Sequence, residues 1–224
     1  FDRFANETGV NVDKLSTFEG IAELSQKYYE WTDAQTPNEP NDGKSFFSAD
    51  SWFNVAEVGM EQLNSGIFDN TAKLSLNNDT YSHIFETLYN PVVKGGMAIY
   101  DGYSSDLSKT GDLVCSTGSS AGILFYGDSI TYADGTIENV EYNILPYPVF
   151  EGGKQIAIQR GGGLMVAKTN EKKEYAASVF IKWLTSPEQN MRFISKTGYL
   201  PVTKQAFEQG MDKHIKNIED TQIH

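Results

Sequence analysis

The amino-acid sequence predicts an α/β fold, and three observations support this prediction. Segments with helical periodicity alternate with short apolar segments along the 224 residues, as they do in α/β domains. The helical segments carry apolar residues three and four positions apart, which gives each helix one face suited to burial. Glycine, proline and asparagine cluster between these segments and mark the turns. A chain of this length can bury roughly 70% of its unfolded surface, so a sizeable core is expected.

The first half of the sequence predicts four helices and one short aromatic segment. The first helix begins at Phe1 and ends at Gly9, because glycine suits the left-handed position after a helix. A second helix is expected from Ser16, since Ser16 and Glu19 have the spacing of a capping box. After a polar loop, the expected elements are an aromatic segment at 46–52, a helix at 53–64, and a helix at 80–94 with Pro91 as a candidate interruption.

The second half alternates turns, short strands and helices. A tight turn is expected at Asp134-Gly135, and the most regular apolar stripe of the chain predicts a helix at 173–185. Pro187 follows Ser186 in a second capping box, so a further helix is expected to start there and to end at Gly198. The remaining expected elements are strands at 142–148 and 156–158, extended segments at 164–167 and 199–202, and a polar helical tail from Lys204.

The segment at 111–127 carries the most informative local pattern. It predicts a short strand, a loop of small polar residues and, from residue 121, a helix. Backbone N–H groups at such a helix start, together with the hydroxyls of Ser119 and Ser120, are suited to bind an anion or a polyol oxygen. The same loop reads Gly118-x-Ser120-x-Gly122, which is the pattern of a hydrolase nucleophile elbow.

A serine hydrolase or esterase using Ser120 is therefore the alternative to a binding loop. A serine nucleophile needs a histidine base and a third group that orients this base. The histidines downstream of Ser120 are His214 and His224, and both lie in the polar tail rather than in a loop typical of a triad base. The sequence favours binding over hydrolysis, and no catalytic residue is assigned.

Composition argues against several other classes of site and partner. The net charge is −12 at pH 7 and no Lys/Arg-rich run occurs, which argues against nucleic acid and against an anionic membrane surface. Cys115 stands alone, so neither an internal disulfide nor a cysteine-based zinc site is expected. No metal-binding motif and no dinucleotide fingerprint occur, so neither a metal nor a cofactor is expected. No run of about 18 apolar residues occurs that could span a membrane.

Glycines and aromatic residues supply the remaining binding signals. Gly161-Gly162-Gly163 is either a bulge or hinge, or a place where the backbone approaches a ligand closely. Trp52 precedes one predicted helix and Tyr199 follows another. Both are compatible with an ordinary core, but flat rings beside hydroxyls and carboxylates also bind the apolar faces of sugars.

Several segments, taken together in their order and spacing, carry a resemblance to a protein family. They are Leu15 to Ile21, Lys109 to Asp112 with Gly118 to Ser120, Gly161 to Val166, Glu174 to Leu184, Ser186 to Gln189, and Thr197 to Val202. This series resembles the extracellular solute-binding receptors of ABC importers, in the group that binds carbohydrates and glycerol 3-phosphate. The resemblance implies a periplasmic-binding-protein-like (type II) α/β lobe, with a mixed sheet flanked by helices. It also implies ligand contacts at Ser119 or Ser120, Gly162 and Tyr199, with Trp52 as a stacking residue.

The same resemblance implies a function. The protein would be the receptor of an ABC uptake transporter that binds a sugar or related polyol, or a glycerol phosphate, between two lobes. It would perform no catalysis and would deliver its solute to a membrane permease. A neutral sugar agrees with the acidic composition, whereas a phosphate would need a nearby cation, for which Arg160 is the candidate.

The resemblance also implies a domain organisation. Residues 1–158 would form mainly one lobe, 159–202 the hinge return and helices that pack with the other lobe, and 203–224 a polar helical tail. The first part of the N-terminal lobe would lie upstream, preceded by the signal of a cell-surface lipoprotein or periplasmic protein. Without that part, the chain is expected either to expose apolar surface or to associate with a second copy.

Overall fold

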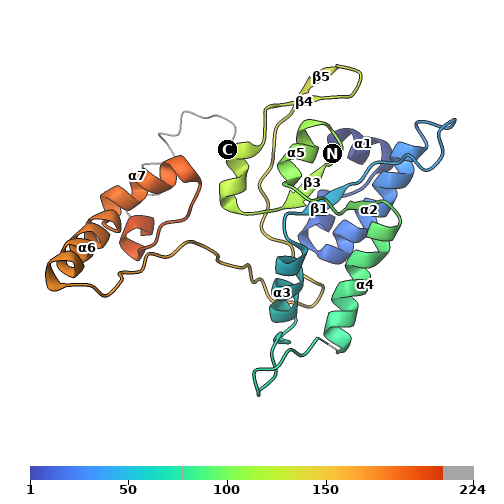
Figure 1. Cartoon of the computed structure of the whole chain (residues 1–224). Coiled ribbons are helices and arrows are strands. Elements are labelled where there is room, and N and C mark those ends of the chain that lie inside the picture. Colours follow the sequence, from blue (N-terminus) through green and yellow to red (C-terminus); the bar gives the residue numbers. More distant parts are fainter. Residues whose placement is uncertain (77, 209–224) are drawn as a thin grey trace. The chain divides into compact units, whose positions relative to one another are not determined.

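The computed structural model describes residues 1–76 and 78–208, and the chain divides into two compact units (Figure 1). Unit 1 comprises Phe1–Gly118 and Tyr126–Ile158. Unit 2 comprises Ser119–Phe125 and the chain from residue 159 onward. The polar tail predicted beyond residue 208 lies outside the described residues.

Unit 1 contains a small parallel sheet. Its strands are β1 (Phe47–Ala49), β2 (Met97–Ala98) and β3 (Cys115–Thr117), in the order β2-β1-β3. A separate antiparallel hairpin joins β4 (Ser129–Thr131) to β5 (Ile137–Asn139). The hairpin turns at Gly135, whose φ of 84° confirms the turn predicted there. The sequence predicted a mixed sheet, and the structure separates the parallel and antiparallel pairings into two sheets.

Five helices accompany the strands of unit 1 in its described residues. They are α1 (Asp2–Thr8), α2 (Phe18–Asp33), α3 (Trp52–Gln62), α4 (Asp79–Val93) and α5 (Ser104–Lys109), with a 3-10 turn η1 (Val12–Ser16) before α2. The helix α4 packs along α2, as Figure 1 shows. Gly9 has a φ of 70° and donates its N–H to Ala5 O, which confirms the predicted end of the first helix. Pro91 lies inside α4 without interrupting it.

The predicted capping box at the start of α2 is shifted by one residue. Thr17 is the N-cap, and its side chain accepts a hydrogen bond from Gly20 N. The hydroxyl of Ser16 donates instead to Asp13 O at 2.6 Å, because η1 brings that carbonyl within reach. Glu19 contacts other parts of unit 1, through His83 Nε2 at 2.8 Å and Glu151 N at 3.0 Å. Its carboxylate therefore joins α2 to α4 and to the turn after Phe150.

The core of unit 1 is rich in aromatic side chains. Its buried members are Phe4, Phe18, Ile21, Leu24, Phe46, Phe47, Ala49, Val55, Met60, Ile84, Leu88, Met97 and Phe150. Phe18 stacks on Phe150 with ring centroids 4.6 Å apart, so residues far apart in the sequence meet at the centre of the unit. Rings of this size bury large apolar areas and contribute much of the stability of such a core.

A buried glutamine shapes the chain where strands were predicted at 142–148 and 156–158. Gln62 Nε2 donates to Pro148 O and Ile156 O, both at 2.9 Å, and Gln62 Oε1 accepts from Phe150 N at 3.0 Å. Neither predicted strand forms, and this part of the prediction is wrong. Three of the backbone groups near these segments are thus bonded by one side chain rather than by a neighbouring strand.

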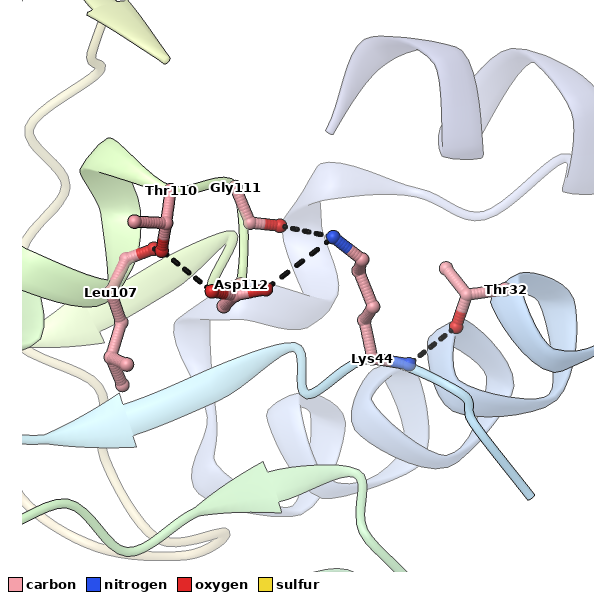
Figure 2. Close-up of polar contacts among 6 residues, drawn as sticks. All are labelled: Thr32, Lys44, Leu107, Thr110, Gly111 and Asp112. Carbon is pink, nitrogen blue, oxygen red and sulfur yellow. Dashed lines mark hydrogen bonds and ion pairs between the residues drawn. The ribbon is translucent and has the colours of Figure 1, made fainter. Parts of the chain in front are cut away.

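The amino ends of β1 and β3 are joined by Lys44 (Figure 2). Lys44 N donates to Thr32 Oγ1 at 2.7 Å, and its ammonium contacts Gly111 O at 3.3 Å and Asp112 Oδ1 at 3.4 Å. Figure 2 also shows Thr110 bonded to the other oxygen of Asp112, at 2.6 Å. One lysine thus ties the segment before β1 to the end of α2 and to the turn before β3.

Unit 2 has little buried core in its described residues. It contains the 3-10 turn η2 (Ser120–Phe125), the helices α6 (Glu171–Leu184) and α7 (Pro187–Thr197), and a helical stretch at 204–208. Its buried apolar residues are Met191, Ile194 and Ala206, whereas α6 buries none. Segment 164–169 forms no strand and borders, with α6, an open apolar groove of about 340 Å³.

The helix ends of unit 2 were predicted well, with one difference. Gly198 ends α7 in the left-handed region with a φ of 68°, as expected. Ser186 is the N-cap of α7 and Pro187 follows it, but no side-chain cap forms. The hydroxyl of Ser186 donates to Trp183 O at 2.6 Å, a carbonyl in the last turn of α6 that also accepts from Ser186 N at 3.1 Å.

Candidate functional site

The carboxyl ends of β1, β2 and β3 lie at one edge of the parallel sheet. The pairing aligns Ala49 with Thr117 and Ser48 with Ala98, and Asp50 N continues the ladder by donating to Thr117 O at 3.0 Å. In open α/β sheets, ligands bind in the crevice outside such carboxyl ends. The residues that follow the three strands are therefore the candidate site of unit 1.

Asp50 links the residues that follow these strands. Its Oδ1 accepts hydrogen bonds from Ser104 N at 2.9 Å and from the Ser104 hydroxyl. Its Oδ2 lies so close to Gly118 that a methyl group there would stand only 2.5 Å from it. Ser104 is buried, whereas Asp50 is exposed. Asp50 was not among the residues predicted from the sequence, where its only signal was its position directly after an aromatic segment.

Trp52, a predicted ligand contact, lies at the same edge. It is the first residue of α3, and the N-cap Ser51 accepts a hydrogen bond from Asn54 N at 3.3 Å. The indole packs edge-on against Phe47, with ring centroids 6.0 Å apart. Its Nε1 is buried and has no hydrogen-bond partner among the described residues. Trp52 is therefore partly a core residue, and its one polar group is buried without a partner among the described residues.

Tyrosines supply further hydroxyl groups around this edge. Tyr126 OH lies 2.5 Å from Ser116 Oγ, and its ring packs against Tyr142 at 5.1 Å. Burial raises the pKa of Tyr126, and the charge of Asp50 adds to this rise, so the hydroxyl stays neutral. On the loop after β2, Tyr100 and Tyr103 are exposed, the latter to 71%. This edge thus offers neutral hydroxyls, exposed rings and the carboxylate of Asp50, with Asp101 and Asp106 on the segment after β2.

The other predicted ligand contacts lie in unit 2. Ser119 and Ser120 are exposed, but the predicted helix from residue 121 is a six-residue 3-10 turn. This correction matters because so short a turn does not align enough peptide dipoles to form an anion site. The first bond of this turn runs from Gly122 N to Ser119 O at 2.9 Å, and this three-residue spacing is that of a 3-10 turn.

The structure brings the serine loop together with the segment that precedes Tyr199. A methyl group at Gly198 would stand 3.0 Å from Ser120 O and 3.1 Å from the Ala121 Cα, so the two backbones are in close contact. Tyr199 is half exposed and its ring stacks on Phe193, 5.9 Å apart and nearly parallel. Gly162 has no such neighbour, since a methyl group there would meet nothing within 4 Å. Two of the predicted contact regions thus meet within unit 2.

No catalytic arrangement surrounds Ser120 in the part of the chain that the structure describes. Its hydroxyl makes no hydrogen bond there, and the described histidine, His83, pairs with Glu19. The histidines of the alternative hypothesis, His214 and His224, lie outside the described residues. Among residues 1–76 and 78–208, no group of three or more potential metal ligands occurs. No helix of this part is long and apolar enough to cross a membrane.

Comparison with known proteins gives a family match over nearly the whole chain. The family described as "Bacterial extracellular solute-binding protein" matches residues 4–220. The sn-glycerol-3-phosphate-binding periplasmic proteins UgpB of Brucella abortus and Rhizobium meliloti are each 28% identical over 164 residues, 71% of this chain. This chain spans 35% of the length of these curated relatives.

Solved structures show the same fold. UgpB from Mycobacterium tuberculosis, in complex with glycerophosphocholine, matches with a TM-score of 0.65 at 19% identity. The match covers 95% of this chain and 51% of that UgpB chain. A cyclic α-maltosyl-1,6-maltose binding protein from Arthrobacter globiformis has a TM-score of 0.60 at 13% identity, covering 92% of this chain and 49% of its own. These likenesses confirm the predicted periplasmic-binding-protein-like α/β fold.

Proposed function

Since this chain belongs to the bacterial extracellular solute-binding proteins, we propose that its parent protein is the receptor of an ABC uptake transporter. It binds a sugar or related polyol, or a glycerol phosphate, between two lobes and releases the solute to a membrane permease. It acts outside the cytoplasmic membrane, as a periplasmic protein or a cell-surface lipoprotein. It performs no catalysis.

The carboxyl edge of the parallel sheet is the single observation that carries this proposal. Trp52 presents part of an indole there, and Tyr100 and Tyr103 present exposed rings. Flat rings bind the apolar C–H faces of a sugar, while hydroxyls and a carboxylate bind its polar rim. The names of the related proteins point to the same chemistry, since they include binders of glycerol 3-phosphate and of a maltosyl oligosaccharide.

In unit 2, the proposed contacts are Ser119 or Ser120, Gly162 and Tyr199. The packing of Gly198 on Ser120 supports a shared role for the serine loop and the tyrosine segment. Gly162 enters the proposal on the family resemblance alone. Unit 2 also carries Arg160, which would serve a phosphate group if the solute has one.

A ligand panel tests the proposal directly. The probes are ribitol, a maltosyl oligosaccharide, sn-glycerol 3-phosphate and glycerophosphocholine, and the measurement is calorimetric titration of the parent protein that contains this chain. We expect at least one probe to bind, and Trp52→Ala to weaken it about tenfold or more, because a stacked ring contributes on the order of 1–2 kcal/mol. Trp183→Ala removes an exposed indole from α6 and is expected to leave binding unchanged. Absence of binding by every probe would contradict the proposal.

The serine hydrolase alternative has its own test. A fluorophosphonate probe labels an activated serine, so we expect no stoichiometric labelling of the wild-type chain. Labelling that disappears in Ser120→Ala but persists in Ser119→Ala would replace the binding proposal with hydrolysis.

A further inference from the structure

We propose that Asp50 makes the unit 1 part of the binding site selective against anionic groups, so that the solute presents an uncharged or cationic group to it. This inference rests on the proposed solute-binding function. It goes beyond that function because it identifies the class of chemical group that the sheet edge accepts and the residue that sets this preference.

The Asp50 carboxylate is fixed in orientation and has no ion-pair partner among the described residues. Oδ1 is held by the N–H and the hydroxyl of Ser104, which fixes the orientation of the group. None of the ion pairs in the described residues includes Asp50. Its Oδ2 faces Gly118, where the absence of a side chain leaves room for it. Asp50 is exposed, so a fixed negative charge without a cationic partner stands at the carboxyl end of β1.

The segments that surround Asp50 carry more negative than positive charge. Residues 46–53, 97–106 and 113–118 contain the three strands and the residues that follow them, and none of these residues is lysine or arginine. They contain two further carboxylates, Asp101 and Asp106, of which Asp106 pairs with Lys109 Nζ at 3.8 Å. Like charges brought together weaken binding, so a phosphate placed beside Asp50 is disfavoured.

Neutral polar groups and aromatic rings surround Asp50 at this edge. Trp52 Nε1 and Tyr142 OH are buried polar atoms that have no partner among the described residues, and Tyr126 OH is shared with Ser116. These are neutral groups, and the exposed rings of Tyr100 and Tyr103 lie on the loop that Ser104 ends. Hydroxyl groups of a solute can form hydrogen bonds with neutral polar groups and with Asp50. A cationic group of a solute would be attracted both by the aromatic rings and by Asp50.

Because Ser104 bonds to Asp50, substitutions must separate the effect of the Asp50 charge from the effect of these hydrogen bonds. Asp50→Asn keeps an oxygen that can accept from Ser104 N and Oγ, but it removes the negative charge. Asp50→Ala removes both. Glu86→Gln is the matched control, since it removes one negative charge from an exposed position of α4. Thermal unfolding of each variant reports whether the fold is retained.

The closing experiment compares ligand pairs that differ in charge. Glycerophosphocholine is paired with sn-glycerol 3-phosphate, and ribitol with ribitol 5-phosphate, in titrations of wild type and variants. For the pair that binds, we expect the wild type to prefer the member with less negative charge. Asp50→Asn should reduce this preference about five- to tenfold, while Glu86→Gln leaves it unchanged. The ratio of the two affinities should also become smaller as the salt concentration rises from about 0.02 M to about 0.5 M, because salt screens an exposed charge.

The outcomes separate this inference from the proposed function. An unchanged preference in Asp50→Asn, or an equal loss of affinity for both members of a pair, would overturn charge selection while leaving solute binding intact. Absence of binding to the wild type by these four compounds and by the maltosyl oligosaccharide would contradict the proposed function, and the inference would fall with it.

Discussion

Unit 1 and unit 2 contain the same kind of amphipathic helix but bury it to different extents. The helix α2 buries five of its residues, among them Phe18, Ile21 and Leu24. The helix α6 has an equally regular apolar stripe and buries none, so that Phe180 and Trp183 are each 52% exposed. Helical periodicity therefore specifies a face that can be buried, whereas the surrounding chain decides whether it is buried.

The largest expected difference concerns matched phenylalanine substitutions. Phe18→Ala removes a fully buried ring stacked on Phe150, and should lower the free energy of unfolding of unit 1 by about 3–5 kcal/mol. Phe180→Ala removes a half-exposed ring from α6 and should cost less than about 1 kcal/mol. Hydrogen exchange followed by mass spectrometry measures both units in one experiment. Similar costs for the two substitutions would show that α6 is buried in solution.

A smaller effect is expected from matched glycine substitutions within unit 2. Gly198 combines a φ of 68° with close contact to Ser120 O, so Gly198→Ala should destabilise α7 and its contact with the serine loop by about 1–2 kcal/mol. Gly122 has a negative φ and open space around it, so Gly122→Ala should be nearly neutral. Helical circular dichroism and amide exchange of α7 measure the difference. Equal behaviour of the two variants would mean that the Gly198 contact is unimportant.

The smallest expected effect is the response to acid. Hydrogen bonds from Lys14 and Lys27 lower the pKa of Glu23, and those from Arg3 and Trp31 lower the pKa of Glu7. A carboxyl group with a lowered pKa contributes stability above its ordinary pKa, and this contribution is lost as pH falls through the pKa of the folded state. The stability of unit 1 should therefore decline as pH falls below about 4.5.

Glu23→Gln tests that acid response. The variant should reduce the pH dependence of amide exchange in α2, because its side chain no longer titrates. Since Glu23 is well exposed, solvent screening keeps the effect small. A pH dependence identical to that of wild type would show that the two lysine contacts contribute nothing measurable.

Local signals predicted much of the secondary structure. Gly9, Gly135 and Gly198 have the left-handed backbone that their positions suggested, because glycine at a turn or helix end is selected by a short-range steric requirement. The helices α3, α4, α6 and α7 lie close to their predicted bounds, because apolar periodicity is visible within one segment. Trp52 was found as a candidate because an aromatic residue directly before a helix is likewise visible locally.

The errors arose where the fold offered a group another partner. The hydroxyl of Ser16 donates to Asp13 O, three residues earlier, because η1 brings that carbonyl within reach. In segments 142–148 and 156–158, Gln62 bonds Pro148 O and Ile156 O, and neither segment forms a strand. The Gln62 contacts cannot be seen in a window of a few residues, since they join groups more than 80 residues apart.

The sequence alone specified the α/β class and most of the helices, and it predicted residues that would contact a solute. Only the tertiary structure placed Asp50 against Ser104 and Gly118, because parallel pairing brings the ends of β1, β2 and β3 to one edge across more than sixty residues of chain. It also decided that α2 is buried and α6 is not. Short-range sterics and periodicity depend on neighbouring residues. Burial and the placement of charges depend on contacts between segments that are far apart in the sequence.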